Sequence, residues 1–229
     1  MKDLLTNPQR RLLVALVIAT AGALGLVAVR MLVVGTRGYG FLAWNLFLAW
    51  VPCALGLLSW RLRRAHIAAF VVVSVAWLAF FPNAPYIVTD LMHLRTTRGA
   101  PLWLDGLVVG AAAATGLFLG LASLHHIQSA LTHRFRRPWV AACIAVLACY
   151  LAAVGVYLGR FLRWNTWDLL SQPDEILADA WATLAEPRLV GFVAALGTAV
   201  VVAYVVYRLV APRLDAGEPE PPTTEPGVT

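Results

Sequence analysis

Two residues that can carry out acid–base chemistry lie one helical turn apart in the segment YIVTDLMHLR. Asp90 and His93 are three positions apart, and Tyr86 precedes Asp90 by four, so an α-helix would place all three on one face. A carboxylate beside an imidazole can act as a general acid and base or bind one metal ion. A hydrogen bond that only orients the segment is the simplest alternative. Asp90 and His93 are the candidate catalytic pair, and we predict no metal site.

Two arginines occur at helical spacing in a second motif, GRFLRWNTWD. If the preceding helix continues through it, Arg160, Arg163 and Trp167 share one face. Two guanidinium groups on one face can bind a phosphate or a carboxylate, which predicts an anionic ligand. Alternatively, both arginines reach toward lipid headgroups beside an interfacial belt of tryptophans. A third alternative is ion pairing inside the protein with Asp90, Asp105 or Asp168.

Other polar residues interrupt long apolar segments. Arg30 lies near the end of the first segment, Asn45 near the start of the second and Asp105 at the start of the fourth. Ionisable groups inside a membrane are energetically costly, so they are usually paired or functional. Together with the two motifs, these residues predict one polar pocket at the outer leaflet. Its predicted lining is Arg30, Asn45, Asn83, Tyr86, Asp90, His93, Asp105, Arg160, Arg163, Asn165 and Asp168.

The composition indicates which elements must position these residues. Of the 229 residues, 60% are hydrophobic and 13% are charged, whereas soluble domains are roughly 45–50% apolar and about 25% charged. A soluble chain of this size would lack the polar surface to cover its core. The composition therefore excludes a soluble enzyme, a disordered chain and a disulfide-stapled secreted domain. It predicts an all-α polytopic membrane helical bundle.

Six apolar segments are long enough to cross a hydrocarbon layer of about 30 Å as helices. They span residues 12–34, 40–59, 65–81, 102–124, 139–159 and 189–211. The apolar run of the first is too long for a signal peptide, so we predict an uncleaved helix. Residues 86–95 and 173–186 are expected to form short interfacial helices on the outer side. Residues 1–211 are thus the predicted membrane domain, and 212–229 a disordered cytoplasmic tail.

The distribution of Lys and Arg predicts the orientation. Positive residues concentrate in cytoplasmic segments, and placing both termini in the cytoplasm puts most Lys and Arg on the inner side. The main inner clusters are Lys2, Arg10 and Arg11; Arg61, Arg63 and Arg64; and Arg134, Arg136 and Arg137. The net charge of +6 is therefore attributed to topology, and we expect no nucleic-acid partner.

The inner connection, residues 125–138, contains three histidines. His125 and His126 are adjacent, so on a helix they point in different directions and are poorly placed to bind one ion. We expect these two side chains and His133 to be solvated at the membrane interface.

Three motifs resemble a bacterial multi-pass membrane family catalogued as domain of unknown function 1361. The stretches are FPNAPYIVTDLMHL at 81–94, WLDG at 103–106 and GRFLRWNTWD at 159–168. The resemblance runs from about residue 40 to residue 210 and implies a multi-pass protein, which we expect in the bacterial inner membrane. It implies no activity, no cofactor and no role for any residue.

Three functions fit these features. The first is an enzyme or binding protein for an anionic headgroup at the outer leaflet, with membrane lipids as partners and the cofactor unknown. The second is a transporter, although few polar residues lie at mid-depth in the predicted spans. The third is an accessory or assembly subunit that docks partners through its outer helices, with the acidic segment 174–186 as the contact surface. The sequence lacks phosphate-loop, nucleophile-elbow, zinc-protease and dinucleotide motifs, so it names no common enzyme class.

Overall fold

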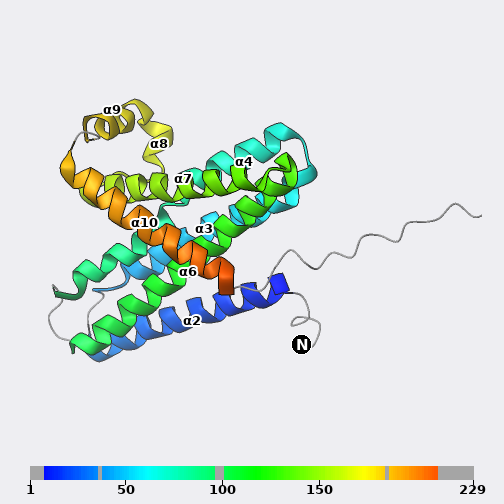
Figure 1. The fold of residues 1–229 in the computed structure, drawn as a ribbon. Helices are drawn as coiled ribbons and strands as arrows, with labels where there is room; N and C mark the ends of the chain where they lie inside the picture. Colours follow the sequence, from blue (N-terminus) through cyan, green and yellow to red (C-terminus); the bar gives the residue numbers. More distant parts are fainter. Residues whose placement is uncertain (1–7, 36–37, 96–100, 184–185, 211–229) are drawn as a thin grey trace, which may run out of the picture.

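The structure, a computed structural model, describes residues 8–35, 38–95, 101–183 and 186–210, and these residues form helices and no strand (Figure 1). The long helices are α2 (Pro8–Val34), α3 (Phe41–Arg61), α4 (Ile67–Phe80), α6 (Leu102–Phe135), α7 (Pro138–Tyr157) and α10 (Pro187–Val210). The short α-helices are α5 (Asn83–Tyr86), α8 (Asp168–Ser171) and α9 (Pro173–Thr183). The 3₁₀ helices η1 (Leu62–Arg64) and η2 (Ile87–Arg95) and the π-helix η3 (Leu158–Leu162) complete the set. The predicted tail, 212–229, lies outside the described residues.

Six helical segments are long and apolar enough to cross a membrane, which confirms the predicted all-α membrane bundle. They cover residues 9–34, 41–64, 67–92, 102–135, 138–162 and 187–210. Helices are expected here because backbone N–H and C=O groups in lipid must pair within their own segment. Large apolar side chains point outward, among them Leu32 at 84% and Leu209 at 80% exposed. The chain is therefore a multi-pass membrane protein.

Helix α6 is central to the bundle and longer than the span that the sequence predicts. It has 34 residues, which is about 51 Å at 1.5 Å per residue, and it contacts α2, α3, α7 and η2. The predicted span ends at Leu124, but the helix continues to Phe135. Protein covers these later turns, since Ile127 and Ala130 are buried.

This extension overturns the expected interfacial solvation of two histidines. His125 and His126 are only 8% and 3% exposed, and the His125 ring packs edge-on against Tyr207 of α10 with centroids 6.1 Å apart. His133, in the last turn of α6, is exposed as expected. Tyr207 lies on α10, which packs beside α6 and α7 and so contributes to the burial of His125. The hydropathy of one segment carries no information about that contact.

One end of the bundle carries the short elements that hold most candidate site residues. Here α4 is followed by α5 and η2, α7 ends in η3, and α8 and α9 connect η3 to α10. Figure 1 shows α8 and α9 together at this end, where α7 finishes and α10 begins. We call it the α8–α9 end.

A glycine on α7 allows the turn between α4 and α5 to approach closely. A Cβ added to Gly155 would lie only 2.6 Å from Cγ of Pro82 in that turn. Any side chain at this position would force the turn away from α7. The contact therefore sets where α5 lies, and with it Asn83 and Tyr86 beside η3.

Candidate functional site

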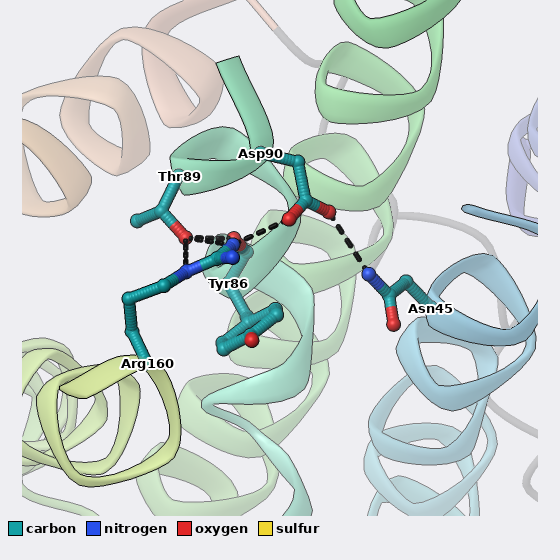
Figure 2. A network of polar contacts seen from close by, with 5 residues as sticks. All are labelled: Asn45, Tyr86, Thr89, Asp90 and Arg160. Atoms are coloured by element: carbon teal, nitrogen blue, oxygen red, sulfur yellow. Dashed lines mark hydrogen bonds and ion pairs between the residues drawn. The ribbon is translucent and has the colours of Figure 1, made fainter. Parts of the chain in front are cut away.

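Arg160, on η3, is the centre of a polar network at the α8–α9 end (Figure 2). Its Nε and Nη2 donate hydrogen bonds to Oγ1 of Thr89 at 2.9 and 2.6 Å. Its Nη2 also forms an ion pair with Oδ1 of Asp90. The guanidinium carbon lies 4.2 Å from the centre of the Tyr86 ring, in a cation–π contact. Arg160 thus joins the end of α7 to α5 and η2.

Asp90 is almost completely enclosed, at 1% exposed. Its second carboxylate oxygen accepts a hydrogen bond from Nδ2 of Asn45 on α3 at 2.9 Å, as Figure 2 shows. A buried carboxylate stays ionised only where charges and hydrogen bonds offset its lost hydration. Arg160 and Asn45 supply both. Of the alternatives that the sequence left open for Arg160, the structure shows the internal ion pair.

The backbone that carries Asp90 differs from the predicted α-helix. Element η2 is a 3₁₀ helix, in which side chains three positions apart align. Ile87 and Asp90 have this spacing and are 0% and 1% exposed, so the 3₁₀ turn directs both into the bundle. Tyr86 lies on α5 and meets Asp90 through Arg160 instead of through α-helical spacing. The side chain of His93 lies outside the described residues, so its pairing with Asp90 stays a prediction.

Arg30 and Asp105 form a second ion pair, separate from the first. Nε of Arg30, on α2, donates to Oδ1 of Asp105, on α6, at 2.9 Å. The two residues are 0% and 1% exposed. The Arg30 guanidinium also lies 4.4 Å from the centre of the Tyr39 ring. The structure brings these two predicted pocket residues to each other and fixes α2 against α6.

A cavity of about 420 Å³ lies beside the Arg160 network, between α3, the α4–α5 turn, the end of α7 and residues 163–169. Its polar lining residues are Asn45, Asn83, Tyr86, Arg163, Asn165 and Thr166. Three tryptophans, Trp44, Trp164 and Trp167, supply aromatic surface. Five predicted pocket residues therefore share this cavity. The remaining described candidates, Arg30, Asp90, Asp105, Arg160 and Asp168, are not part of its lining.

Arg163 differs from the other candidate arginines because its guanidinium has no hydrogen bond or ion pair to any described residue. The sequence predicts a helix that continues through Arg163, but in the structure the helix ends at Leu162. Backbone N–H groups of Arg163 and Trp164 both donate to the carbonyl of Leu158, which closes η3, and Arg163 takes a left-handed conformation with φ of 65°. The shared face with Arg160 and Trp167 therefore does not form. Arg163 is exposed at the cavity instead.

The loop after Arg163 is held by two of the predicted site residues. Nδ2 of Asn83 donates to Oγ1 of Thr166 at 3.0 Å, which links the loop to α5. Oδ2 of Asp168 accepts from the backbone N–H of Asn165 at 2.7 Å and fixes the turn into α8. Asn83 and Asn165 line the cavity, whereas Asp168 positions the loop that forms its wall.

A family model for a protein of unknown function (DUF1361) matches residues 44–203, which is more than half of the chain. The chain belongs to this family. Searches of curated proteins and of solved structures find no match.

The DUF1361 match contains the complete cavity lining, which runs from Trp44 to Ile176, and the complete Arg160 network. Arg30 lies outside the match, and Asp105 lies inside it. The buried Arg30–Asp105 pair thus joins the first helix to the DUF1361 region.

Several contributors to this site were not predicted from the sequence. Thr89 accepts from Arg160, Thr166 accepts from Asn83, and Asp179 accepts from Nε1 of Trp164 at 2.9 Å. Thr89 is next to Asp90, and that adjacency was an available signal. Nothing in the spacing of Asp179 relative to Trp164 indicates a contact, because it depends on how α9 folds back on the loop.

Proposed function

We propose that this DUF1361 protein binds a lipid with an anionic headgroup in the cavity beside Arg163. The observation that carries the proposal is an exposed guanidinium at a cavity, with no partner among the described residues. A guanidinium offers five N–H donors in a planar fork that suits phosphate. A volume of about 420 Å³ is within the range of small-ligand sites, roughly 300–1,000 Å³.

Exposed apolar surface at the cavity favours a lipid over a soluble anion. Trp44, Trp167 and Leu169 line the cavity and are 54%, 46% and 41% exposed. Tryptophan is enriched where a membrane meets water, at the depth of the headgroups. A headgroup beside Arg163 would leave its acyl chains against this apolar rim.

The basic clusters support an outer-leaflet position for the cavity. The first basic cluster, Arg61, Arg63 and Arg64, lies in the last residue of α3 and in η1. The second, Arg134, Arg136 and Arg137, runs from the last turn of α6 to the start of α7. Both lie at the helix ends opposite the α8–α9 end. Because positive residues favour the cytoplasm, we place both termini there. The α8–α9 end then lies at the outer leaflet of what the sequence resemblance indicates is a bacterial inner membrane.

Binding, without chemistry on the ligand, is the activity that this geometry supports. Asp90 is the strongest candidate for an acid–base group, but it is 1% exposed and holds Arg160 and Asn45. The described cavity lining contains no carboxylate and no imidazole. Arg160 is likewise engaged in its ion pair with Asp90, which leaves Arg163 to bind the negative charge of the ligand.

Lipid retention in nanodiscs tests the proposal, with native mass spectrometry to count lipids that stay bound. Replacing a charge-assisted hydrogen-bond donor costs about 1.5–3 kcal/mol, so Arg163→Ala should lower retention of anionic lipid about ten- to hundredfold. Arg188→Ala is a matched control, because Arg188 is also exposed near the α8–α9 end but does not line the cavity. Equal retention by the wild type, Arg163→Ala and Arg188→Ala would refute the proposal.

A further inference from the structure

The amide side chains of the cavity restrict what its ligand can be. Nδ2 of Asn45 donates to the Asp90 carboxylate at 2.9 Å. A carboxylate can only accept, so this contact fixes which way the amide points. Figure 2 shows the Asn45 oxygen on the side away from Asp90. Asn45, a residue of the cavity lining, therefore keeps its oxygen as an acceptor and one N–H as a donor.

Asn83 is fixed in the same way. Its Nδ2 donates to the backbone carbonyl of Phe80 at 2.9 Å and to Oγ1 of Thr166 at 3.0 Å. Both donor positions of the amide are thereby used, because an NH₂ group has two hydrogens. The oxygen of Asn83 therefore remains available and is the second amide acceptor among the residues that line the cavity. A ligand with hydrogen-bond donors of its own would match these two acceptors.

We infer that the headgroup bound in this cavity is a phosphodiester that carries hydroxyl groups. This inference rests on the proposed function. Arg163 would bind the phosphate, and hydroxyls next to the phosphate would donate to the oxygens of Asn45 and Asn83. The rings of Trp44, Trp164 and Trp167 are suited to the carbon face of a polyol. Trp164 can offer only its ring, since its Nε1 already donates to Asp179 at 2.9 Å.

An ammonium group is the other donor found in lipid headgroups, and the charges disfavour it. Arg163 is the charged residue of the described lining, and no carboxylate there would offset a second cation. The carboxylate of Asp90 is closed off behind Arg160 and Asn45. Hydroxyls supply the same donors without adding positive charge, so the structure favours a polyol headgroup.

Three lipids with identical acyl chains separate these chemistries. Phosphatidylglycerol and phosphatidylethanol both carry one negative charge, but only the first has headgroup hydroxyls, and phosphatidylethanolamine adds an ammonium. Each is added in equal amount to phosphatidylcholine nanodiscs that hold the full chain, and bound lipid is counted by native mass spectrometry. Two neutral hydrogen bonds predict that phosphatidylglycerol is retained about fivefold or more over phosphatidylethanol.

The variants assign each part of the effect. Arg163→Ala should lower retention of both anionic lipids, whereas Asn83→Ala removes one of the two acceptors and should reduce the preference for phosphatidylglycerol over phosphatidylethanol. Equal retention of the two anionic lipids by the wild type, still dependent on Arg163, overturns the hydroxyl inference and leaves the proposed function standing. Preferential retention of phosphatidylethanolamine also overturns it. Retention that does not depend on Arg163 refutes the proposed function itself. The wild-type comparison decides the inference even if Asn83→Ala does not fold.

Discussion

Removing either partner of the Arg160–Asp90 pair should destabilise the protein, but by unequal amounts. Arg160→Met removes the Arg160 cation from a carboxylate that is 1% exposed, while the Asn45 amide still donates to it. Breaking a buried ion pair by removing one partner costs about 3–5 kcal/mol. At roughly 2–4 °C per kcal/mol for a chain of this size, the melting temperature should fall by about 6–20 °C.

Asp90→Asn should cost less, about 1–2 kcal/mol. The Arg160 side chain is 13% exposed, keeps both hydrogen bonds to Thr89 and its contact with Tyr86, and can still donate to the new amide oxygen. The asymmetry arises because the anion is the more deeply enclosed partner. It would not arise if the pair merely stabilised by mutual attraction at a surface.

Native cysteines provide the assay. Cys53 and Cys149 are buried at 2% and 0% exposed, and Cys143 is exposed. In a Cys143→Ser background, a thiol-reactive fluorophore should report unfolding as the two buried thiols become accessible on heating. Arg163→Met is the matched control and should melt like the background, since its guanidinium has no described partner. The reasoning is wrong if Asp90→Asn melts below Arg160→Met, or if Arg160→Met melts like Arg163→Met.

Two further substitutions test the cavity's construction. Gly155→Ala should cost about 1–3 kcal/mol and reduce lipid retention, because its Cβ would lie 2.6 Å from Cγ of Pro82. Gly106→Ala should do neither, because its Cβ would meet no other described segment within 4 Å. Arg163→Gly should raise the melting temperature by about 2–4 °C, since glycine relieves about 1 kcal/mol at a φ of 65°, while abolishing retention of anionic lipid. A lower melting temperature of Arg163→Gly, with retention of anionic lipid unchanged, would contradict this prediction.

The sequence predicts the helices of this protein well because lipid imposes one requirement on every span. The six apolar segments and the short helix α9, with Pro173 at its start and acidic residues in its first turn, form largely where the pattern places them. Burial of His125 and His126 is not predictable in this way. The burial of His125, for example, involves Tyr207 of α10, which lies more than eighty residues later in the chain.

The candidate site was predictable by residue type but not by backbone geometry. Five residues of the proposed pocket do line one cavity, among them Asn45 and Arg163. The α-helical spacing assumed for both motifs is wrong, because most of the first motif is a 3₁₀ helix and the second contains a π-helix that ends at Leu162. Packing decides which kind of helix each motif forms, as the burial of Ile87 together with Asp90 illustrates. Periodicity in a polar segment does not encode them.

The three candidate arginines show why one of them, and not the pair in the motif, is assigned to the ligand. Arg30 and Arg160 are enclosed, and an enclosed cation in a membrane protein requires an anion, which Asp105 and Asp90 supply. Arg163 is exposed and meets no described partner. Its left-handed backbone alone is no functional signal, since Arg136 adopts the same conformation where α6 ends. Both arginines line a cavity, but only the cavity beside Arg163 contains amides, which are already oriented by the first ion pair and by the loop. The closed Arg160 network therefore shapes the site, and the open arginine supplies its charge.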